Sequence, residues 1–425
     1  MKINNLQNTD GIKNFPPAVV IPSDRPASLG IARSLGRRGI PVYGVDSDPT
    51  AIGMRSRFLK PCPLPNADGS ELNKLEYLVS LGKELGEAVL FPVSDEDMIL
   101  CSRFRNELQK NYHFVMADHA TITSVLTKDG LHKIATMHEI PAPQMFPACS
   151  RADVNNIADS ISYPVILKPV FSPSWLRDEI VSLLRNSFLS GSPKVVYCQN
   201  AQMLLEAYGK IAVYDPNMII EEVIPGEDER LAYYCFYLDR QSRKLAGFAG
   251  RKLRILPVGF GSATFVRSFY DPDLEKISCK LLSYIHYQGL GGIEFKKDLR
   301  DEQYKLIEFN ARLGLWDSLS IRCGIDIPYI AYCDALEWQV DAQSQYRENV
   351  LWIDFQRDVR AFIILNKRKQ LSFKTWLKSF SGEKEWAIYS RDDWKPALSS
   401  FCKLFERPRK SIRNKLSSFV SKKKA

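Results

Sequence analysis

Two acidic residues face each other across a predicted β-hairpin in the stretch GGIEFKKDLRDEQYKLIEFNARLG, residues 291–314. Apolar residues alternate with polar ones on both arms, and this period of two predicts two half-buried strands joined by a turn at 298–303. Pairing that is symmetric about Asp301 places Glu294 directly opposite Glu308. Like charges opposed across a ladder destabilise it, so the surroundings must compensate them.

Two interpretations of this acid pair are open from the hairpin alone. In the first, the acids lie on the wet face of a sheet, where Lys296 and Lys305 relieve the repulsion. In the second, Glu294 and Glu308 join Asn310, two residues further along the same face, in holding a divalent cation. Mg²⁺ prefers oxygen ligands and is usually held by one or two carboxylates plus substrate phosphates.

Length and composition predict a soluble protein of two or three domains, because 425 residues exceed one typical core. The first residues lack the apolar segment of a secretory signal, and no apolar run reaches the ~18 residues of a membrane-spanning helix. The nine cysteines include no CxxC pair. Neither a zinc site nor a disulfide framework is therefore expected, and a reduced, cytoplasmic compartment fits best.

The net charge of +9 is concentrated at the C-terminus. Residues 401–425 hold nine of the 58 basic residues and one of the 49 acidic ones, which leaves 49 basic and 48 acidic residues in the rest of the chain. A neutral body gives no support to nucleic-acid binding. The basic tail, 406–425, is expected to be either a solubilising terminus or a weak contact with the anionic inner face of a membrane.

A βαβ pattern at residues 18–46 predicts a parallel sheet near the N-terminus. An apolar strand at 18–21 precedes a helix that ends near Gly39, and IPVYGVD follows as a second buried strand. Asp46 at the end of that strand suggests a nicotinamide oxidoreductase. The first turn, PSDRPASLG, argues against it because it lacks the GxGxxG through which the backbone approaches a pyrophosphate.

Three lysines stand where lysine is unexpected: Lys128 opens a helix, Lys168 ends the buried strand of YPVILKPV, and Lys194 begins an apolar run. Each alone is more often a solvated side chain. A lysine on a buried strand is costly without an anion, however, and phosphate is a common one. The acidic strand at 219–230, IIEEVIPGEDER, is either an ordinary edge strand or one that offers hydrogen bonds to adenine and ribose.

Seven motifs, taken in order, resemble those of the ATP-grasp superfamily. They are TKDGLHKIA, YPVILKP, SGSPKV, IIEEVIPGED, GRKLR, GIEFKKD and LIEFNAR. The resemblance covers residues 16–345. Within the superfamily, the sequence most resembles carboxylate–amine ligases of the D-aspartate ligase type, in which a unit like DDWKPAL also follows the ATP-grasp domain. It implies an α/β chain: a Rossmann-like domain (16–125), an ATP-grasp domain of two α+β subdomains that clasp ATP (126–345, lid about 145–225), an appended C-terminal unit (346–405) and the tail.

The resemblance also implies a function and a site. The expected enzyme is an ATP-dependent ligase that joins a small-molecule carboxylate to a small-molecule amine through an acyl phosphate, with an amino acid as one substrate. Its expected cofactors are ATP and Mg²⁺ or Mn²⁺. The alternative is an ATP-binding regulatory or scaffold protein that keeps the fold without ligation. The residues that it implies are Glu294, Glu308 and Asn310 for the metal; Lys128, Lys168 and Lys194 for the phosphates; Glu221, Glu222 and Ile224 for adenine; Asp228 for ribose; and Lys252, Arg254 and Arg312 for catalysis.

The segment that follows Lys168 departs from the family pattern. It lacks the glycine run of many members and shows leucines at helical spacing instead. A partly helical flap is therefore expected there.

Overall fold

A computed structural model describes residues 15–65, 70–170, 174–175, 177–187 and 195–403. The chain divides into two compact units, 1–114 with 335–337 and 388–425, and 115–334 with 338–387. Among the described residues, no helix has the length and apolar character needed to cross a membrane.

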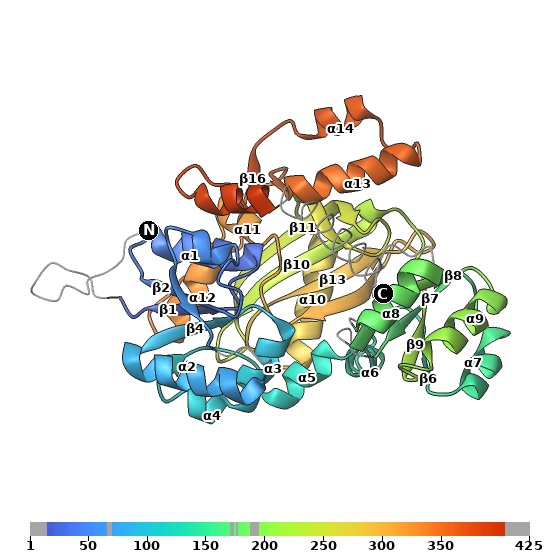
Figure 1. Ribbon diagram of the computed structural model, residues 1–425, viewed down its shortest axis with the longest axis horizontal. Helices are drawn as coiled ribbons and strands as arrows, with labels where there is room; N and C mark the ends of the chain where they lie inside the picture. The colour runs from blue at the N-terminus through green and yellow to red at the C-terminus, as the bar shows by residue number, and fades with distance from the viewer. Residues whose placement is uncertain (1–14, 66–69, 171–173, 176, 188–194, 404–425) are drawn as a thin grey trace, which may run out of the picture. The chain divides into compact units, whose positions relative to one another are not determined.

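A five-stranded parallel sheet is the centre of the first unit (Figure 1). Its elements are β1 (Ala18–Ile21), α1 (Pro26–Gly36), β2 (Val42–Asp46), η1 (Gly53–Arg55), β3 (Lys60–Pro63), α2 (Glu71–Leu85), β4 (Ala88–Pro92), α3 (Asp95–Arg103), α4 (Arg105–Leu108) and β5 (Tyr112–His113). The strand order β3-β2-β1-β4-β5 places the first strand in the middle, as in doubly wound α/β folds. The predicted βαβ unit is thus present as β1, α1 and β2.

Asp46, the residue that suggested a dinucleotide site, closes the turn after β1. Its carboxylate accepts hydrogen bonds from the backbone N–H groups of Ser23 and Asp48, both at 2.8 Å. These bonds use both oxygens of the side chain. Asp46 therefore has a local structural role that accounts for its position at the end of the strand.

The C-terminal part of the chain is anchored to the first unit by a buried ion pair. Arg33 on α1 donates from Nε to Asp393 Oδ2 at 3.0 Å, and both side chains are at least nine-tenths buried. The same carboxylate accepts hydrogen bonds from Ser56 Oγ at 2.7 Å and from Arg57 N at 2.9 Å. The DDWKPAL motif thus belongs to the first unit, while residues 338–387 belong to the second.

The larger sheet of the second unit has seven strands in the order β14-β13-β10-β11-β12-β15-β16. Its strands are β10 (Leu231–Leu238), β11 (Lys244–Leu256), β12 (Ser262–Ser268), β13 (Gly289–Lys297), β14 (Tyr304–Asn310), β15 (Leu351–Ile353) and β16 (Lys384–Trp386). The helices outside the lid are α5 (His119–Leu126), α6 (Lys128–Met137), α10 (Pro272–Tyr284), α11 (Ser318–Cys323), α12 (Ile327–Ala335), α13 (Phe355–Lys367) and α14 (Phe373–Ser379). Neighbouring strands are antiparallel except for the parallel pair β15–β16.

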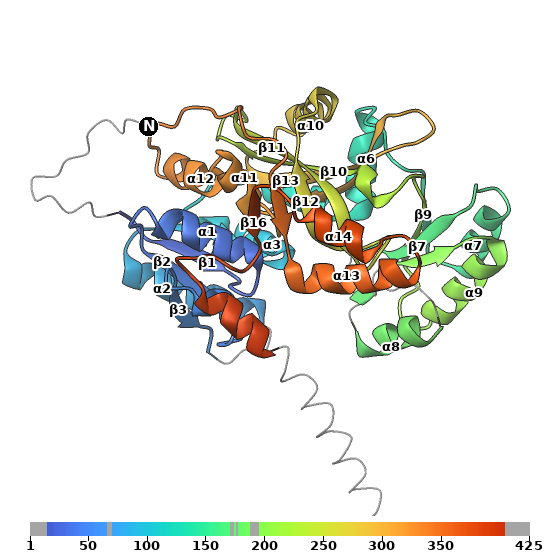
Figure 2. The same ribbon diagram turned by 90° about the horizontal axis from the view of Figure 1, so that it is seen from above.

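A smaller antiparallel sheet, β6-β9-β7-β8, lies in the segment predicted to be the lid, and we keep the name lid for it. Its elements are β6 (Met145–Ala148), α7 (Arg151–Ala158), β7 (Val165–Pro169), α8 (Asp178–Ser187), β8 (Val196–Cys198), α9 (Ala201–Ile211), β9 (Met218–Glu222) and η3 (Asp228–Arg230), which follows it. Helices α7, α8 and α9 bury their apolar residues against one face of the sheet (Figure 2). Helix α8 confirms that the flap is partly helical, and the other face is left for the site.

Candidate active site

The predicted hairpin forms, and a β-bulge brings its two acids into register. Glu294 on β13 pairs with Glu308 on β14, whereas the next rung pairs Phe295 with Leu306. Ile307 is therefore an extra residue on β14. Because a one-residue shift exchanges the two faces of a strand, the bulge allows Leu306 to pair with Phe295 in the core while Glu308 stays on the face of Glu294.

Each acid of the pair is bound by a lysine. Lys252 on β11 lies 2.5 Å from Glu294 (Nζ to Oε2), and both side chains are about nine-tenths buried. Lys128, the first residue of α6, lies 3.1 Å from Glu308 (Nζ to Oε1), whose side chain is 42% exposed. The two lysines relieve the repulsion between the acids.

A third lysine–acid pair lies on the lid. Lys168 on β7 is bound to Glu221 on β9, and both side chains are buried. Burial lowers the pKa of Lys168, and the nearby Glu221 only partly offsets it. Burial also lowers the pKa of Lys128, but Glu308, Glu221 and Glu294 together raise it above its ordinary value. Since Lys128 interacts with acids from both sheets, the three pairs are one cluster between the lid and the large sheet.

The other residues of the acidic strand lie around this cluster. Glu222 binds Arg300 at 2.6 Å (Oε1 to Nη1), and its Oε2 accepts a hydrogen bond from Gln144 N at 3.0 Å. Ile224 is buried. Burial raises the pKa of Asp228, although the nearby Lys296 and the N–H of Gly259 lower it in part.

Arg254 lies apart from the acid pair, although it is only two residues from Lys252. A register shift in β11 pairs Lys252 with Val266 but Arg254 with Phe265. Consecutive residues of β12 point to opposite faces, so the expected common face of the two basic residues is lost. The guanidinium of Arg254 instead donates two hydrogen bonds to Asp358 on α13, at 2.7 and 3.0 Å.

Asn310 and Arg312 follow the acid pair along the chain. Asn310 pairs with Gly292, two rungs from the Glu294–Glu308 rung. Because side chains alternate along a strand, Asn310 lies on the same face as Glu308. Arg312 lies close enough to Tyr233 and to the buried Asp317 to affect the pKa of both. Lys194, the remaining predicted phosphate ligand, lies outside the described residues.

Two buried polar residues near Arg312 were not predicted. Tyr233 on β10 is 3% exposed, and its hydroxyl has no hydrogen-bond partner among the residues that the structure describes. Asp317 accepts a hydrogen bond from Gly314 N at 2.5 Å, and burial raises its pKa to about 6. Tyr233 pairs with Glu294 in the sheet, and this strand register could not be deduced from the sequence.

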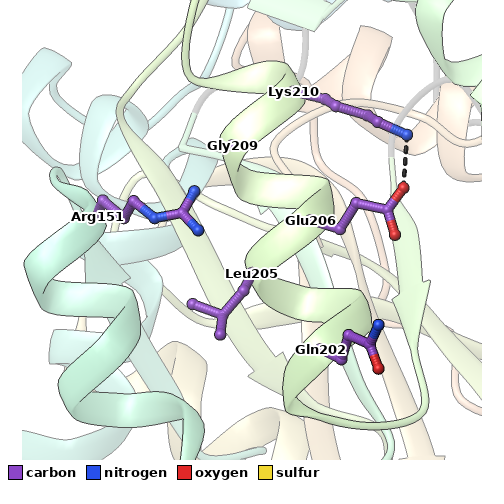
Figure 3. Close-up of a pocket in the computed structure, with 6 residues that line it drawn as sticks. All are labelled: Arg151, Gln202, Leu205, Glu206, Gly209 and Lys210. Carbon is purple, nitrogen blue, oxygen red and sulfur yellow. Dashed lines mark hydrogen bonds and ion pairs between the residues drawn. The ribbon is translucent and has the colours of Figure 1, made fainter.

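Two surface hollows lie on the lid. One, of about 520 Å³, includes Met145, Pro147, Val170 and Ile219 in its wall. The strand register puts Met145 and Ile219 on the same sheet face as Glu221 and Lys168. The other, of about 710 Å³, lies between α7 and α9 on the opposite side, where Lys210 binds Glu206 at 2.6 Å (Figure 3). None of the predicted site residues lines this second hollow.

The oxygen donors on the hairpin fit Mg²⁺. Glu294 and Glu308 are cross-strand neighbours, and Asn310 supplies an amide oxygen on the same face. Within the described ranges, no group of three or more His, Cys, Asp or Glu side chains is placed to hold a metal ion. A metal here would thus depend on two acids, an amide and non-protein oxygens, which is the coordination typical of Mg²⁺ bound with substrate phosphates.

Comparisons with known proteins identify the fold. No family model matches the sequence. D-aspartate ligase from Enterococcus faecium (strain Aus0004) is 23% identical over 280 residues, which are 64% of this chain and 60% of that protein. Biotin carboxylase from Campylobacter jejuni, solved with an ATP analogue, superposes with a TM-score of 0.60 at 16% identity over 79% of this chain and 74% of that one.

A second solved structure is an L-amino acid ligase from Bacillus licheniformis. It superposes with a TM-score of 0.56 at 16% identity and covers 76% of this chain and 74% of that one. These likenesses confirm the expected α/β architecture, in which a Rossmann-like domain precedes the ATP-grasp fold. The chain therefore has the ATP-grasp fold that its motifs predicted.

Proposed function

We propose that this protein is an ATP-dependent ligase that joins a carboxylate to an amine through an acyl phosphate, with an amino acid as one substrate. The observation that carries the proposal is the cluster of three lysine–acid pairs between the lid and the large sheet. Such a cluster offers cations to phosphates and oxygens to a metal in one place. The similarity to a D-aspartate ligase and an L-amino acid ligase supports the amino-acid substrate.

Phosphoryl transfer requires positioning and charge neutralisation more than a protein nucleophile. We assign Lys128 and Lys168 to the phosphates of ATP, and Glu294, Glu308 and Asn310 to Mg²⁺. When bound, Mg²⁺ supplies positive charge to the phosphate oxygens. The cluster is balanced, with one lysine for each acid, so the lysines would exchange carboxylate partners for phosphate oxygens when the nucleotide binds.

The remaining predicted residues are assigned to the ends of the nucleotide and to the acid substrate. The strand that contains Glu221, Glu222 and Ile224 would lie along adenine, and Asp228 would accept hydrogen bonds from ribose. Arg312 would bind the substrate carboxylate and then the acyl phosphate, because a guanidinium can donate two parallel hydrogen bonds to such groups. We do not place Arg254 among the residues that contact substrate.

The proposal is tested by incubating the protein with ATP, Mg²⁺ and a panel of amino acids that includes D-aspartate, with and without amine acceptors. We expect ADP release that depends on one amino acid, and an amide product detected by mass spectrometry. Binding of ATP without any amino-acid-dependent ADP release across the panel would favour the regulatory or scaffold alternative.

We further propose a cytoplasmic location with a weak membrane contact through the tail. All nine cysteines are free thiols in the structure, which is compatible with a reducing compartment. The tail, 406–425, lies outside the described residues, and its membrane contact rests on its basic amphipathic sequence alone.

A further inference from the structure

The loop that joins β11 to β12, residues 257–261 (PVGFG), lies between the proposed ribose site and the lid. The backbone N–H of Gly259 lies close enough to the carboxylate of Asp228 to lower its pKa. The ring of Phe260 lies 5.9 Å from the ring of Tyr197 on β8 of the lid (centroid to centroid). One short loop thus contacts both the acid assigned to ribose and the subdomain expected to close over ATP.

The conformation of this loop requires glycine at two positions. Gly259 has a φ of +97°, a conformation that L side chains rarely adopt. A side chain at Gly261 would lie 2.1 Å from the carbonyl carbon of Leu256. Because glycine also permits many other conformations, the position of the loop depends on what holds its two ends.

The first turn of α13 holds both ends of the loop. Arg357 donates from Nη2 to the carbonyl oxygen of Leu256 at 3.0 Å, on the β11 side. On the β12 side it donates to the carbonyl oxygens of Ser262 and Ala263, each at 3.1 Å. Helix α13 lies against β11 and β12 (Figures 1 and 2). The single side chain of Arg357 therefore connects the two ends of the loop.

The next residue, Asp358, holds the two strands directly below the loop. It is fully buried and accepts four hydrogen bonds: two from Arg254 on β11, one from Thr264 Oγ1 on β12 at 3.0 Å, and one from Trp376 Nε1 on α14 at 2.8 Å. The ring of Phe265 lies 4.0 Å from the guanidinium carbon of Arg254. Arg254 is therefore bound to α13 through both of its hydrogen bonds to Asp358.

We infer that the start of α13 is a clamp that positions the 257–261 loop for nucleotide binding, with Arg357, Asp358 and Arg254 as positioning residues. The inference rests on the proposed function, because it assumes that Asp228 lies at the nucleotide. On this inference, helix α13 positions part of the nucleotide site. Arg254 then acts on the nucleotide indirectly, by holding β11 to α13, and does not contact phosphate.

The test compares Arg357→Gln with Arg360→Gln. Both remove an arginine charge from α13, but Arg360 is exposed one turn further along the helix. We expect Arg357→Gln to weaken binding of Mg²⁺ and a non-hydrolysable ATP analogue about tenfold, as outer-shell substitutions often do, and to raise KM for ATP with a smaller change in kcat. Arg357→Lys should restore part of the affinity, and Arg360→Gln should match the wild type.

Hydrogen–deuterium exchange separates the clamp from the proposed function. Arg357→Gln should speed exchange of the amides of residues 258–261 in full-length protein without nucleotide, and Arg360→Gln should not. Unchanged exchange, or an analogue affinity equal to that of Arg360→Gln, would overturn the clamp. If the wild type binds no ATP analogue while the loop amides respond as expected, the nucleotide role is wrong but the clamp itself stands.

Discussion

Matched substitutions of Glu294 and Glu308 should have similar effects on activity but different effects on stability. Glu294→Gln and Glu308→Gln remove the same charge from directly opposed residues. If both acids hold Mg²⁺ with ATP, each variant should lose turnover by at least about 100-fold, the range seen when a preorganised electrostatic contact is removed. Both variants also relieve the repulsion between the two acids, so this contribution cancels when their unfolding free energies are compared with each other.

The two variants should differ in stability because the two acids differ in burial. The Lys252–Glu294 pair is about nine-tenths buried, whereas Glu308 is 42% exposed where it meets Lys128. Breaking a buried pair by removing one partner costs about 3–5 kcal/mol, and the amide that remains in Glu294→Gln keeps the loss near the lower end. The Lys128–Glu308 pair is only partly buried, and Glu221 and Glu294 still stabilise the charge of Lys128 when Glu308 is lost. Glu308→Gln should therefore cost only about 1 kcal/mol, near the range of exposed pairs.

Urea unfolding without metal or nucleotide measures the stability of both variants, and amino-acid-dependent ADP release measures their activity. Lys252→Met added to Glu294→Gln provides a control: it removes the unpaired charge, so it should recover most of the lost stability and none of the activity. Wild-type turnover in Glu308→Gln would end its assignment to the metal. Equal stability of the two single variants would refute the argument from burial.

Three further expectations concern Arg312, Asp317 and the tail. Arg312→Lys should slow acyl-phosphate formation about 10–100-fold with nearly unchanged ATP affinity, because an ammonium lacks the paired donors of a guanidinium; a collapse of ATP binding would assign Arg312 to the nucleotide instead. Burial raises the pKa of Asp317 to about 6, so its contribution to stability is full below about pH 4 and is lost as the pH rises through 6. The unfolding free energy of the wild type relative to Asp317→Asn should therefore fall by roughly 2–3 kcal/mol between about pH 4 and 7, and a flat difference would contradict this. Full-length protein should sediment with anionic vesicles at low salt but not at high salt, and deletion of 406–425 should abolish this; equal sedimentation of the two proteins would leave the tail a solubiliser.

The periodicity of the sequence was sufficient to predict most of the framework. The βαβ unit at the N-terminus, the strand that contains Lys168 and the 291–314 hairpin all lie where apolar residues recur at strand or helix spacing. These patterns are local, so each segment shows them by itself. The division of the C-terminal region between the two units could not be predicted in this way, because it depends on long-range partners such as Arg33 for Asp393.

The strand register explains why the candidate site was predictable only in part. A symmetric hairpin about Asp301 predicts the Glu294–Glu308 rung, and the structure has that rung only because Ile307 is bulged. The same kind of irregularity had the opposite consequence in β11, where simple alternation places Lys252 and Arg254 on one face and the register shift separates them. The alternation of apolar and polar residues cannot reveal a bulge. An extra residue moves every later side chain of the strand to the opposite face of the sheet, and the sequence carries no mark of it.

The partners of the three lysines show a second limit, which is electrostatic. Lys128 and Lys168 could be recognised as unusual from their places at a helix start and on an apolar strand, whereas Lys252 was named only through the family resemblance. The compensating acid of each lysine lies far away in sequence: Glu308 for Lys128, Glu221 for Lys168 and Glu294 for Lys252. Because each buried charge requires a partner, the number of acids in the site could be expected from the number of lysines. The assignment of each acid to its lysine required the fold, and so did the finding that Lys128 interacts with acids of both sheets. That interaction makes Lys128 the residue through which closure of the lid and occupation of the hairpin acids would be coupled.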